Sequence, residues 1–209
     1  MVADRRGKAK AMKTFFTSDL HFGHEKVLEM DGRPFKTIDE MDEELITRWN
    51  NKVEKGDIVY VLGDFIWKTA TSEAAAIIKK LNGQIILIRG NHDRFLSSAP
   101  AKKAVAGVKD YDDICVTLAD GTPKRVILSH YFIPFYNGHR HNAIHLHGHS
   151  HNTEEHIMEL GIIQAINASG YNLQIYNVGC MHWDYAPVTL DEMLQSAQMP
   201  TGDVKEGDE

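Results

Sequence analysis

The chain has 209 residues, of which 43% are hydrophobic and 25% charged, and its formal net charge is −6. This length and composition are those of one globular domain with a substantial core. With this negative net charge, the protein has no broad positive electrostatic field that would attract duplex nucleic acid or an anionic membrane. Two cysteines are too few for a disulfide framework, and no apolar run has the length of a membrane span or of a secretory signal. We therefore expect a cytoplasmic protein without membrane association.

The N-terminal residues predict an arm followed by a strand and a helix. Residues 1–13 are basic and poor in apolar side chains, which is typical of a flexible arm and allows a contact with nucleic acid. Residues 14–18 (TFFTS) predict a strand that leads into Asp19. Thr37 and Glu40 form a capping-box signature, and apolar residues at helical spacing extend the predicted helix to about Val53.

The next elements alternate between buried strands and a helix. Strands are predicted for residues 57–62 (DIVYVL) and 84–88 (QIILI), and a helix for residues 72–81 between them. The first strand leads into Gly63-Asp64 and the second into Arg89-Gly90-Asn91-His92-Asp93.

The second half of the chain has more consecutive strands. Asp120-Gly121 predicts a hairpin turn between strands at 114–118 and 125–129, and a further strand is predicted at 172–178. Helices are predicted at 155–168 and after Thr189. Residues 200–209 have the composition of a disordered acidic tail. Without a repeat or a linker, residues 14–199 form a single predicted domain.

This order of elements predicts an α/β fold with helical layers around stacked sheets. In such folds ligands collect beyond the carboxyl ends of the strands. Four polar residues follow that rule, because each lies within three residues of the end of an apolar strand: Asp19, Asp64, Asn91 and His130.

Residues 129–151 contain seven of the twelve histidines. The stretch ends in Gly148-His149-Ser150-His151, which places two imidazoles two residues apart after an apolar segment. Imidazole is the commonest protein ligand for divalent transition ions, so one interpretation is a metal site. The alternative interpretation is a solvated, histidine-rich loop with adventitious metal affinity.

Five short motifs occur in order along the chain: Asp19-x-His21, Gly63-Asp64, Gly90-Asn91-His92-Asp93, His130, and Gly148-His149-Ser150-His151. Each is weak alone, but each follows a predicted strand, and the ordered set resembles the calcineurin-like metallophosphoesterases over residues 14–185. Residues 177–179 (NVG) and 183–188 (WDYAPV) are similar to small bacterial and phage members of that superfamily. The resemblance implies a four-layer α/β/β/α sandwich with two stacked mixed β-sheets.

The resemblance also implies a centre of two divalent metal ions. Three residues would hold the first ion: Asp19, His21 and His151. Three would hold the second: Asn91, His130 and His149. Asp64 would bridge both, because a carboxylate can supply one oxygen to each. This ligand mix suits Mn²⁺, which is the expected metal, or Fe²⁺, Ni²⁺ and Zn²⁺, and the absence of thiolate argues against a closed structural zinc site.

The implied reaction is the hydrolysis of a phosphodiester or small phosphomonoester, with a nucleotide-like substrate as one option. A hydroxide bridging two ions about 3.5–4 Å apart would attack in line. His92 would protonate the leaving oxygen as a general acid, its alternative role being to fix the loop by hydrogen bonds. Asp93 would either orient His92 or cap the following turn.

Substrate contacts are predicted for Arg94 and His24, with Arg89 and Lys68 as further phosphate-binding candidates. The alternatives are a surface charge for each cation and a helix-start position for His24. Protein Ser/Thr phosphatases carry Gly-Asp-x-x-Asp-Arg at the second motif, whereas Trp67 and Lys68 stand here. This departure favours a small phosphoesterase of another branch. A nuclease and a non-catalytic scaffold on the same fold remain alternatives, and the acidic balance disfavours a duplex nuclease.

Overall fold

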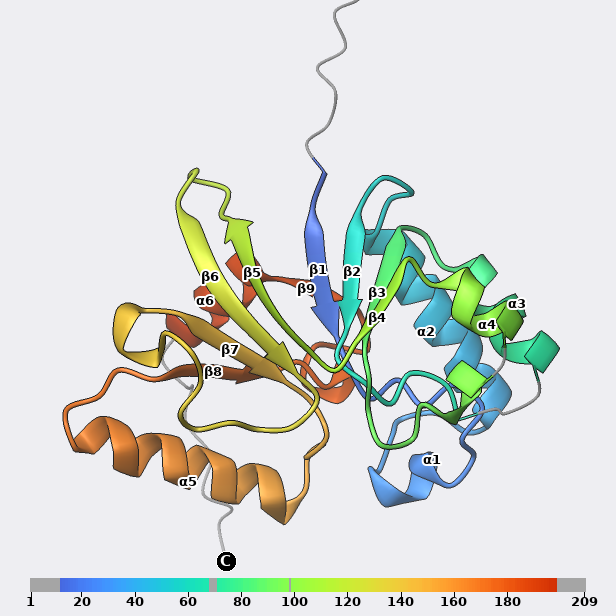
Figure 1. Ribbon diagram of the computed structural model, residues 1–209. Coiled ribbons are helices and arrows are strands. Elements are labelled where there is room, and N and C mark those ends of the chain that lie inside the picture. Colours follow the sequence, from blue (N-terminus) through green and yellow to red (C-terminus); the bar gives the residue numbers. More distant parts are fainter. Residues whose placement is uncertain (1–11, 68–70, 98, 199–209) are drawn as a thin grey trace, which may run out of the picture.

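The computed structural model of the chain describes residues 12–67, 71–97 and 99–198 (Figure 1). Most of the predicted basic arm and all of the predicted acidic tail lie outside the described residues. The structure confirms the α/β class: two mixed β-sheets lie against each other, with helices on their outer sides.

The first sheet has five strands in the order β4-β3-β2-β1-β9. Four of them run parallel: β1 (Thr14–Thr17), β2 (Ile58–Val61), β3 (Gln84–Ile88) and β4 (Gly107–Lys109). The fifth, β9 (Val188–Thr189), is antiparallel to β1. Three helices belong to its outer layer: α2 (Ile38–Lys52), α3 (Thr71–Lys80) and α4 (Ala99–Ala104). The short helix α1 (Val27–Met30) follows β1.

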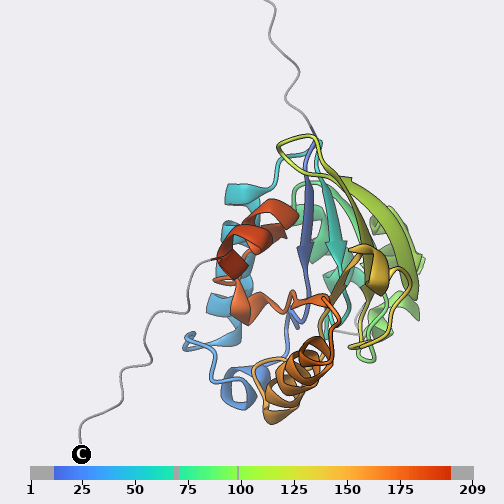
Figure 2. The same ribbon diagram turned by 90° about the vertical axis from the view of Figure 1, so that its left-hand side faces the viewer.

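The second sheet has four strands in the order β5-β6-β7-β8. Their bounds are β5 (Tyr111–Thr117), β6 (Pro123–Ser129), β7 (Ile144–His147) and β8 (Gln174–Asn177), and only the β5–β6 pair is antiparallel. Helix α5 (Glu154–Ala168) covers its outer face. Helix α6 (Leu190–Gln198), red in Figure 2, follows β9 and contributes Leu190 and Met193 to the core between the sheets. At its start, Glu192 Oε1 is 2.9 Å from Nζ of Lys52, the last residue of α2.

Strand alternation explains the four layers, because successive side chains of a strand point to opposite faces of the sheet. On β1, Phe15 packs with the helices of the outer layer, whereas Phe16 packs between the sheets. On β6, Leu128 belongs to the same inter-sheet core and Ile127 packs toward α5. Both faces of the central strands are therefore buried, which is why their sequences are continuous apolar runs.

The long helix α2 begins where the sequence predicts. Thr37 Oγ1 accepts a hydrogen bond from the Glu40 backbone N–H at 3.2 Å, and the Glu40 carboxylate accepts from the backbone N–H of Lys36 at 2.8 Å. Such contacts satisfy amide donors that have no partner within the first turn of a helix. At the other end, the Trp49 indole donates to the Asn82 carbonyl and ties α2 to the loop after α3.

Several short elements were not predicted. Helices α1 and α4 and strands β4 and β9 are too short to carry a periodic signal. Strand β5 is longer than its predicted range because it begins with polar residues at a sheet edge, where Asp113 pairs with Arg125 of β6.

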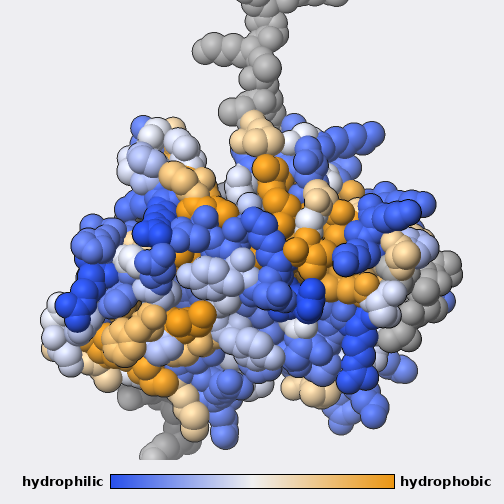
Figure 3. Space-filling model, in the orientation of Figure 1, coloured by the Kyte–Doolittle hydropathy of each residue, from blue (hydrophilic) through white to orange (hydrophobic). Residues whose placement is uncertain are grey.

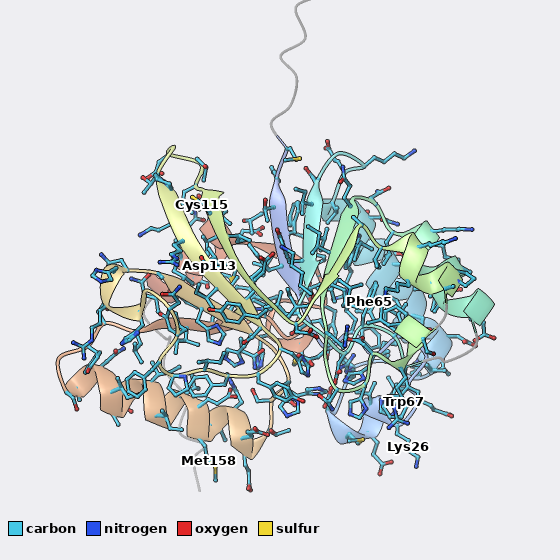
Figure 4. All side chains as sticks on the ribbon, viewed as in Figure 1. Lys26, Phe65, Trp67, Asp113, Cys115 and Met158 are labelled. Atoms are coloured by element: carbon cyan, nitrogen blue, oxygen red, sulfur yellow. The ribbon has the colours of Figure 1, made fainter. Side chains whose placement is uncertain are left out.

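Helix α5 is apolar around most of its circumference. Glu159 is its one buried residue, whereas Ile157, Met158, Leu160 and Ile162 are 43–67% exposed. Figure 3 shows apolar side chains gathered over this helix, and Figure 4 shows Met158 pointing away from the body of the protein. Within the described ranges, no helix combines the length and the apolar character needed to cross a membrane.

Candidate metal centre

The predicted ligands lie in loops that follow the strands. Asp19 and His21 follow β1, Asp64 follows β2, and Asn91 follows β3. The second sheet supplies His130 after β6, and His149 and His151 after β7. Backbone hydrogen bonds join neighbouring loops within each sheet: Asp19 N–H donates to the Gly63 carbonyl, and Gly148 N–H donates to the His130 carbonyl. Across the two sheets, His149 N–H donates to the Asp19 carboxylate at 3.0 Å. The structure thus brings all seven residues to one end of the sandwich.

Five of the seven residues have a left-handed backbone. Their φ angles are 55° at Asp19, 52° at His21, 51° at Asp64, 72° at His149 and 48° at His151. This region is uncommon for residues other than glycine, and such strain is concentrated at functional sites. The strand–loop junctions are therefore shaped to turn these side chains toward a common point.

Two glycines permit the close approach of the loops. A Cβ at Gly90 would collide with the Asp64 carboxylate, and one at Gly148 would lie 2.6 Å from Asp19 Oδ2. Because any larger side chain would displace a carboxylate of the centre, these positions of the sequence motifs require glycine.

A first group of ligand atoms comes from Asp19, His21 and His151. The Nε2 atoms of His21 and His151 are 3.3 Å apart, and His151 Nε2 is 3.5 Å from Asp19 Oδ1. All three residues offer atoms within 4.8 Å of one another. Asp19 and His21 are buried, and His151 is half-buried.

A second group comes from Asn91, His130 and His149. Asn91 Oδ1 is 2.8 Å from His130 Nε2 and 3.1 Å from His149 Nδ1. Asp64 lies between the two groups: its Oδ2 is 3.6 Å from His21 Nε2, and its Oδ1 is 3.7 Å from His130 Nε2. One carboxylate therefore directs a separate oxygen to each group.

The hydrogen bonds of two histidines show that the arrangement fits divalent cations. His130 Nδ1 donates to the Leu62 carbonyl at 2.8 Å, and His151 Nδ1 donates to Asp31 Oδ1 at 2.7 Å. In the neutral ring this leaves a lone pair on Nε2, which faces other lone-pair atoms at 2.8–3.5 Å. A cation in each group would satisfy these atoms together, because a histidine whose Nδ1 donates to a carbonyl or carboxylate presents the lone pair of its Nε2 to a metal. Imidazole, carboxylate and amide oxygen suit Mn²⁺, Fe²⁺, Ni²⁺ and Zn²⁺.

The charges of the centre also favour a cation. Burial would raise the pKa of Asp19, but the hydrogen bond and charge of His151 hold it well below its usual range. Burial would lower the pKa of His151, but hydrogen bonds to Asp19 and Asp31 raise it to about 10. Burial lowers the pKa of His21 to about 3. Without a metal, the carboxylates therefore retain a proton on His151, and a metal ion has to displace it.

Asp31 and Arg33 support His151 and were not predicted. Asp31 Oδ2 accepts from Arg33 Nε at 2.9 Å, while its Oδ1 accepts from His151. Arg33 Nη2 also donates to the backbone carbonyl of Asp19 at 2.7 Å. Both residues are buried in the loop after α1, and no sequence pattern marks them. Asp31 is 120 residues from His151 in the chain.

Asp93 joins the second and third motif loops. Its buried carboxylate accepts from the backbone N–H groups of Asp64 at 3.1 Å, Phe65 at 2.9 Å and Gly90 at 2.7 Å. Burial raises its pKa to about 6, even though these three donors favour the charged form. The carboxylate thus joins the loop that carries Asp64 to the loop that carries Gly90 and His92.

The Gly-His-Ser-His turn is anchored through its serine. Ser150 Oγ donates to Glu159 of α5 at 2.6 Å and accepts from Asn177 Nδ2 of β8 at 3.0 Å. These contacts fix the turn that carries His149 and His151.

His145 and His147 are buried on the side of the second sheet that α5 covers. His145 Nδ1 donates to the Ile127 carbonyl at 3.2 Å, and its Nε2 accepts from the Ile133 N–H at 3.1 Å. His147 Nδ1 donates to the Gly148 carbonyl at 3.0 Å. His145 is therefore a core histidine whose two nitrogens are both satisfied.

A pocket of about 460 Å³ opens beside the centre. Its lining includes His21, His24, Trp67, His92 and His151. His92 is half-buried and is not one of the seven predicted metal ligands. Its backbone N–H donates to Asp64 Oδ1 at 2.8 Å. The other predicted contacts lie elsewhere: Arg94 and Arg89 line a separate hollow with Lys102, and Lys68 lies outside the described residues.

His139 and His141 are not part of the centre. They lie in the short 3₁₀ turn His139–His141, where His139 Nδ1 donates to the Tyr136 carbonyl and its ring stacks on Tyr171. His139 lines a different hollow together with Arg140.

Comparisons with known proteins agree with this architecture. The chain is similar to the Gene 66 protein of Mycobacterium phage D29, with 29% identity over 92% of this chain and 98% of the phage protein. It is 45% identical to the uncharacterised protein MJ1445 of Methanocaldococcus jannaschii, but only over 40% of this chain and 48% of that protein. The crystal structure of AQ665, a protein of unknown function from Aquifex aeolicus, has the same fold, with a TM-score of 0.65, 24% identity, and coverage of 89% of this chain and all of that one.

The model of the calcineurin-like phosphoesterase family matches residues 12–167, which include all seven predicted metal ligands and His92. Members of this family are generally metal-dependent phosphoesterases, and the clusters of aspartate and histidine agree with that activity. The chain belongs to the calcineurin-like phosphoesterase family.

Proposed function

We propose that this protein hydrolyses a phosphodiester or a small phosphomonoester with the help of two divalent metal ions. Mn²⁺ is the metal expected at both positions. The observation that carries the proposal is the position of Asp64, whose two carboxylate oxygens are directed to separate groups of ligand atoms. When bound, two such ions lower the pKa of water and neutralise charge on the phosphoryl oxygens.

The residues of the chain would divide the remaining work. His92 lines the pocket beside the centre, and its ring centroid is 5.8 Å from that of His21. It is therefore placed to donate a proton to the leaving oxygen of a phosphoester held at the centre. Asp93 would position His92 indirectly, because its carboxylate accepts hydrogen bonds from Gly90 N–H in the His92 loop and from Asp64 N–H, and the Asp64 carboxylate accepts from His92 N–H.

Activity of the purified protein tests the proposal. Metal-free protein should not cleave bis-p-nitrophenyl phosphate, and adding back Mn²⁺ should restore turnover. The His130→Ala variant should lose activity, whereas the His139→Ala variant should keep it, because His139 lies in another hollow. This result would locate the reaction at the candidate centre. Equal activity with and without metal would refute the proposal.

The general-acid role of His92 has its own test. His92→Ala should retain both metals but lose about 10²–10⁴-fold in rate on alkyl phosphoesters, whose leaving groups need a proton. The loss should be much smaller with p-nitrophenyl esters, whose leaving group departs as an anion. Equal losses on both substrates would instead assign phosphate binding to His92, and the comparison requires that chemistry limits both rates.

A further inference from the structure

An aromatic wall forms one side of the pocket beside the metal centre. The rings of His24 and Trp67 stack with their centroids 3.8 Å apart and an interplanar angle of 8°. His24 covers one face of the indole, yet Trp67 is still 40% exposed and lines the pocket. Figure 4 shows Trp67 beside helix α1, and Lys26, the residue before α1, also lines the pocket.

The position of this wall is fixed by the backbone. The Trp67 N–H donates to the Phe22 carbonyl at 3.0 Å, which joins the loop after β2 to the loop that carries His21 and His24. Val27 and Met30 of α1 add apolar surface to the same pocket. An exposed tryptophan held in this way supplies a flat apolar surface at little cost in conformational entropy.

The wall lies next to the proposed general acid. The Trp67 and His92 ring centroids are 4.9 Å apart. A leaving oxygen that accepts a proton from His92 is therefore close to the indole, and the group attached to that oxygen would extend over it. The volume of about 460 Å³ is within the range of small-molecule sites.

We infer that the pocket is a leaving-group subsite that selects phosphoesters whose leaving group carries a flat ring, such as a nucleobase or an aryl group, by stacking it on Trp67. This inference rests on the proposed function. Trp67, supported by His24, would be the residue that determines specificity for this class of substrate.

The centre has a second exposed aromatic residue, which makes a matched control. Tyr131 is 50% exposed and packs edge-to-face on His149, with centroids 4.6 Å apart. It lies beside the second group of ligands, whereas Trp67 lies beside His21 of the first. Loss of either ring removes aromatic surface near the metals, but only loss of Trp67 removes it next to His92.

The test compares two ligands that cannot be hydrolysed, benzylphosphonate and methylphosphonate. Their dissociation constants would be measured by calorimetry on the Mn²⁺-loaded wild type, Trp67→Ala, Trp67→Phe and Tyr131→Ala. We expect the wild type to prefer the benzyl compound by about 5- to 100-fold, the range for one aromatic stacking partner. Trp67→Ala should abolish this preference, Trp67→Phe should retain part of it, and Tyr131→Ala should leave it unchanged.

Two results would overturn the inference. The first is no preference for the benzyl compound in the wild type, and the second is a preference that is lost in Tyr131→Ala but kept in Trp67→Ala. Because the readout is binding, it is independent of turnover. If the wild type binds both phosphonates equally but hydrolyses phosphoesters, the subsite alone is refuted. If it prefers benzylphosphonate but hydrolyses no phosphoester, the proposed function is refuted.

Discussion

Replacing Asp31 with asparagine should change the tautomer of His151, moving the ring hydrogen from Nδ1 to Nε2. Arg33 has only donors, so an asparagine at position 31 would turn its amide oxygen toward the guanidinium that now binds Asp31 Oδ2. Its NH₂ group would then face His151 Nδ1, which now donates to Asp31 at 2.7 Å. The imidazole would carry its hydrogen on Nε2, the atom directed at Asp19 and His21.

The expected effect is on metal affinity. Loss of such a supporting carboxylate typically weakens metal binding by about 10–100-fold, or about 1.4–2.8 kcal/mol. The second group of ligands does not contain His151, so the metal it binds should be affected less. Calorimetric titration of metal-free Asp31→Asn with Mn²⁺ should therefore show one weakened site and one site close to the wild type.

Asp57→Asn is the matched control. Asp57 is also buried and accepts from the backbone N–H groups of Lys13 and Glu54, but it precedes β2 at the end remote from Asp64. Both variants should be less stable than the wild type, since each weakens buried hydrogen bonds. Only Asp31→Asn should lose metal affinity. Wild-type affinity at both sites in a folded Asp31→Asn protein would refute this account of His151.

Two further predictions concern the carboxylate proposed to bridge the two metals, Asp64, and a core histidine, His145. Asp64→Asn should impair binding of both metals, because one neutral oxygen cannot serve two cations; elemental analysis showing two ions bound at wild-type affinity would contradict it. Burial lowers the pKa of His145 from 6.5 to about 3 in the folded state. The unfolded chain therefore takes up a proton first, and the stability contributed by neutral His145 is present above pH 6.5 and is lost as the pH falls toward 3. His145→Gln should make the free energy of unfolding of the metal-free protein less dependent on pH in that range, by up to about 1.4 kcal/mol per pH unit. An unchanged pH dependence of the unfolding free energy, measured by denaturant titrations at several pH values, would show that the pKa of His145 is not lowered in the folded state.

The sequence was sufficient to predict the main elements and the position of the site. The apolar runs at 57–62 and 84–88 are buried on both faces, so their strands could be identified without tertiary information. The residues that follow each run then had to lie at the carboxyl end of a strand, where Asp64 (two residues after the first run) and Asn91 (three residues after the second) are found. The family model and the structural neighbour confirm the fold that the ordered motifs implied.

The sequence was insufficient where a contact joins distant segments. Asp31 and Arg33 lie in a loop without periodic pattern, and their roles depend on His151, which is more than one hundred residues away. The three backbone donors of Asp93 come from two loops, and their convergence depends on the pairing of β2 with β3. The stacking of Trp67 on His24 similarly requires the two loops to be adjacent.

Anomalous diffraction from crystals soaked in Mn²⁺ would locate the metal ions and their ligands. We expect two peaks in each chain, one among Asp19, His21 and His151 and the other among Asn91, His130 and His149, with an Asp64 oxygen at each. A single tetrahedral ion, or an ion held by His139 and His141, would contradict this expectation.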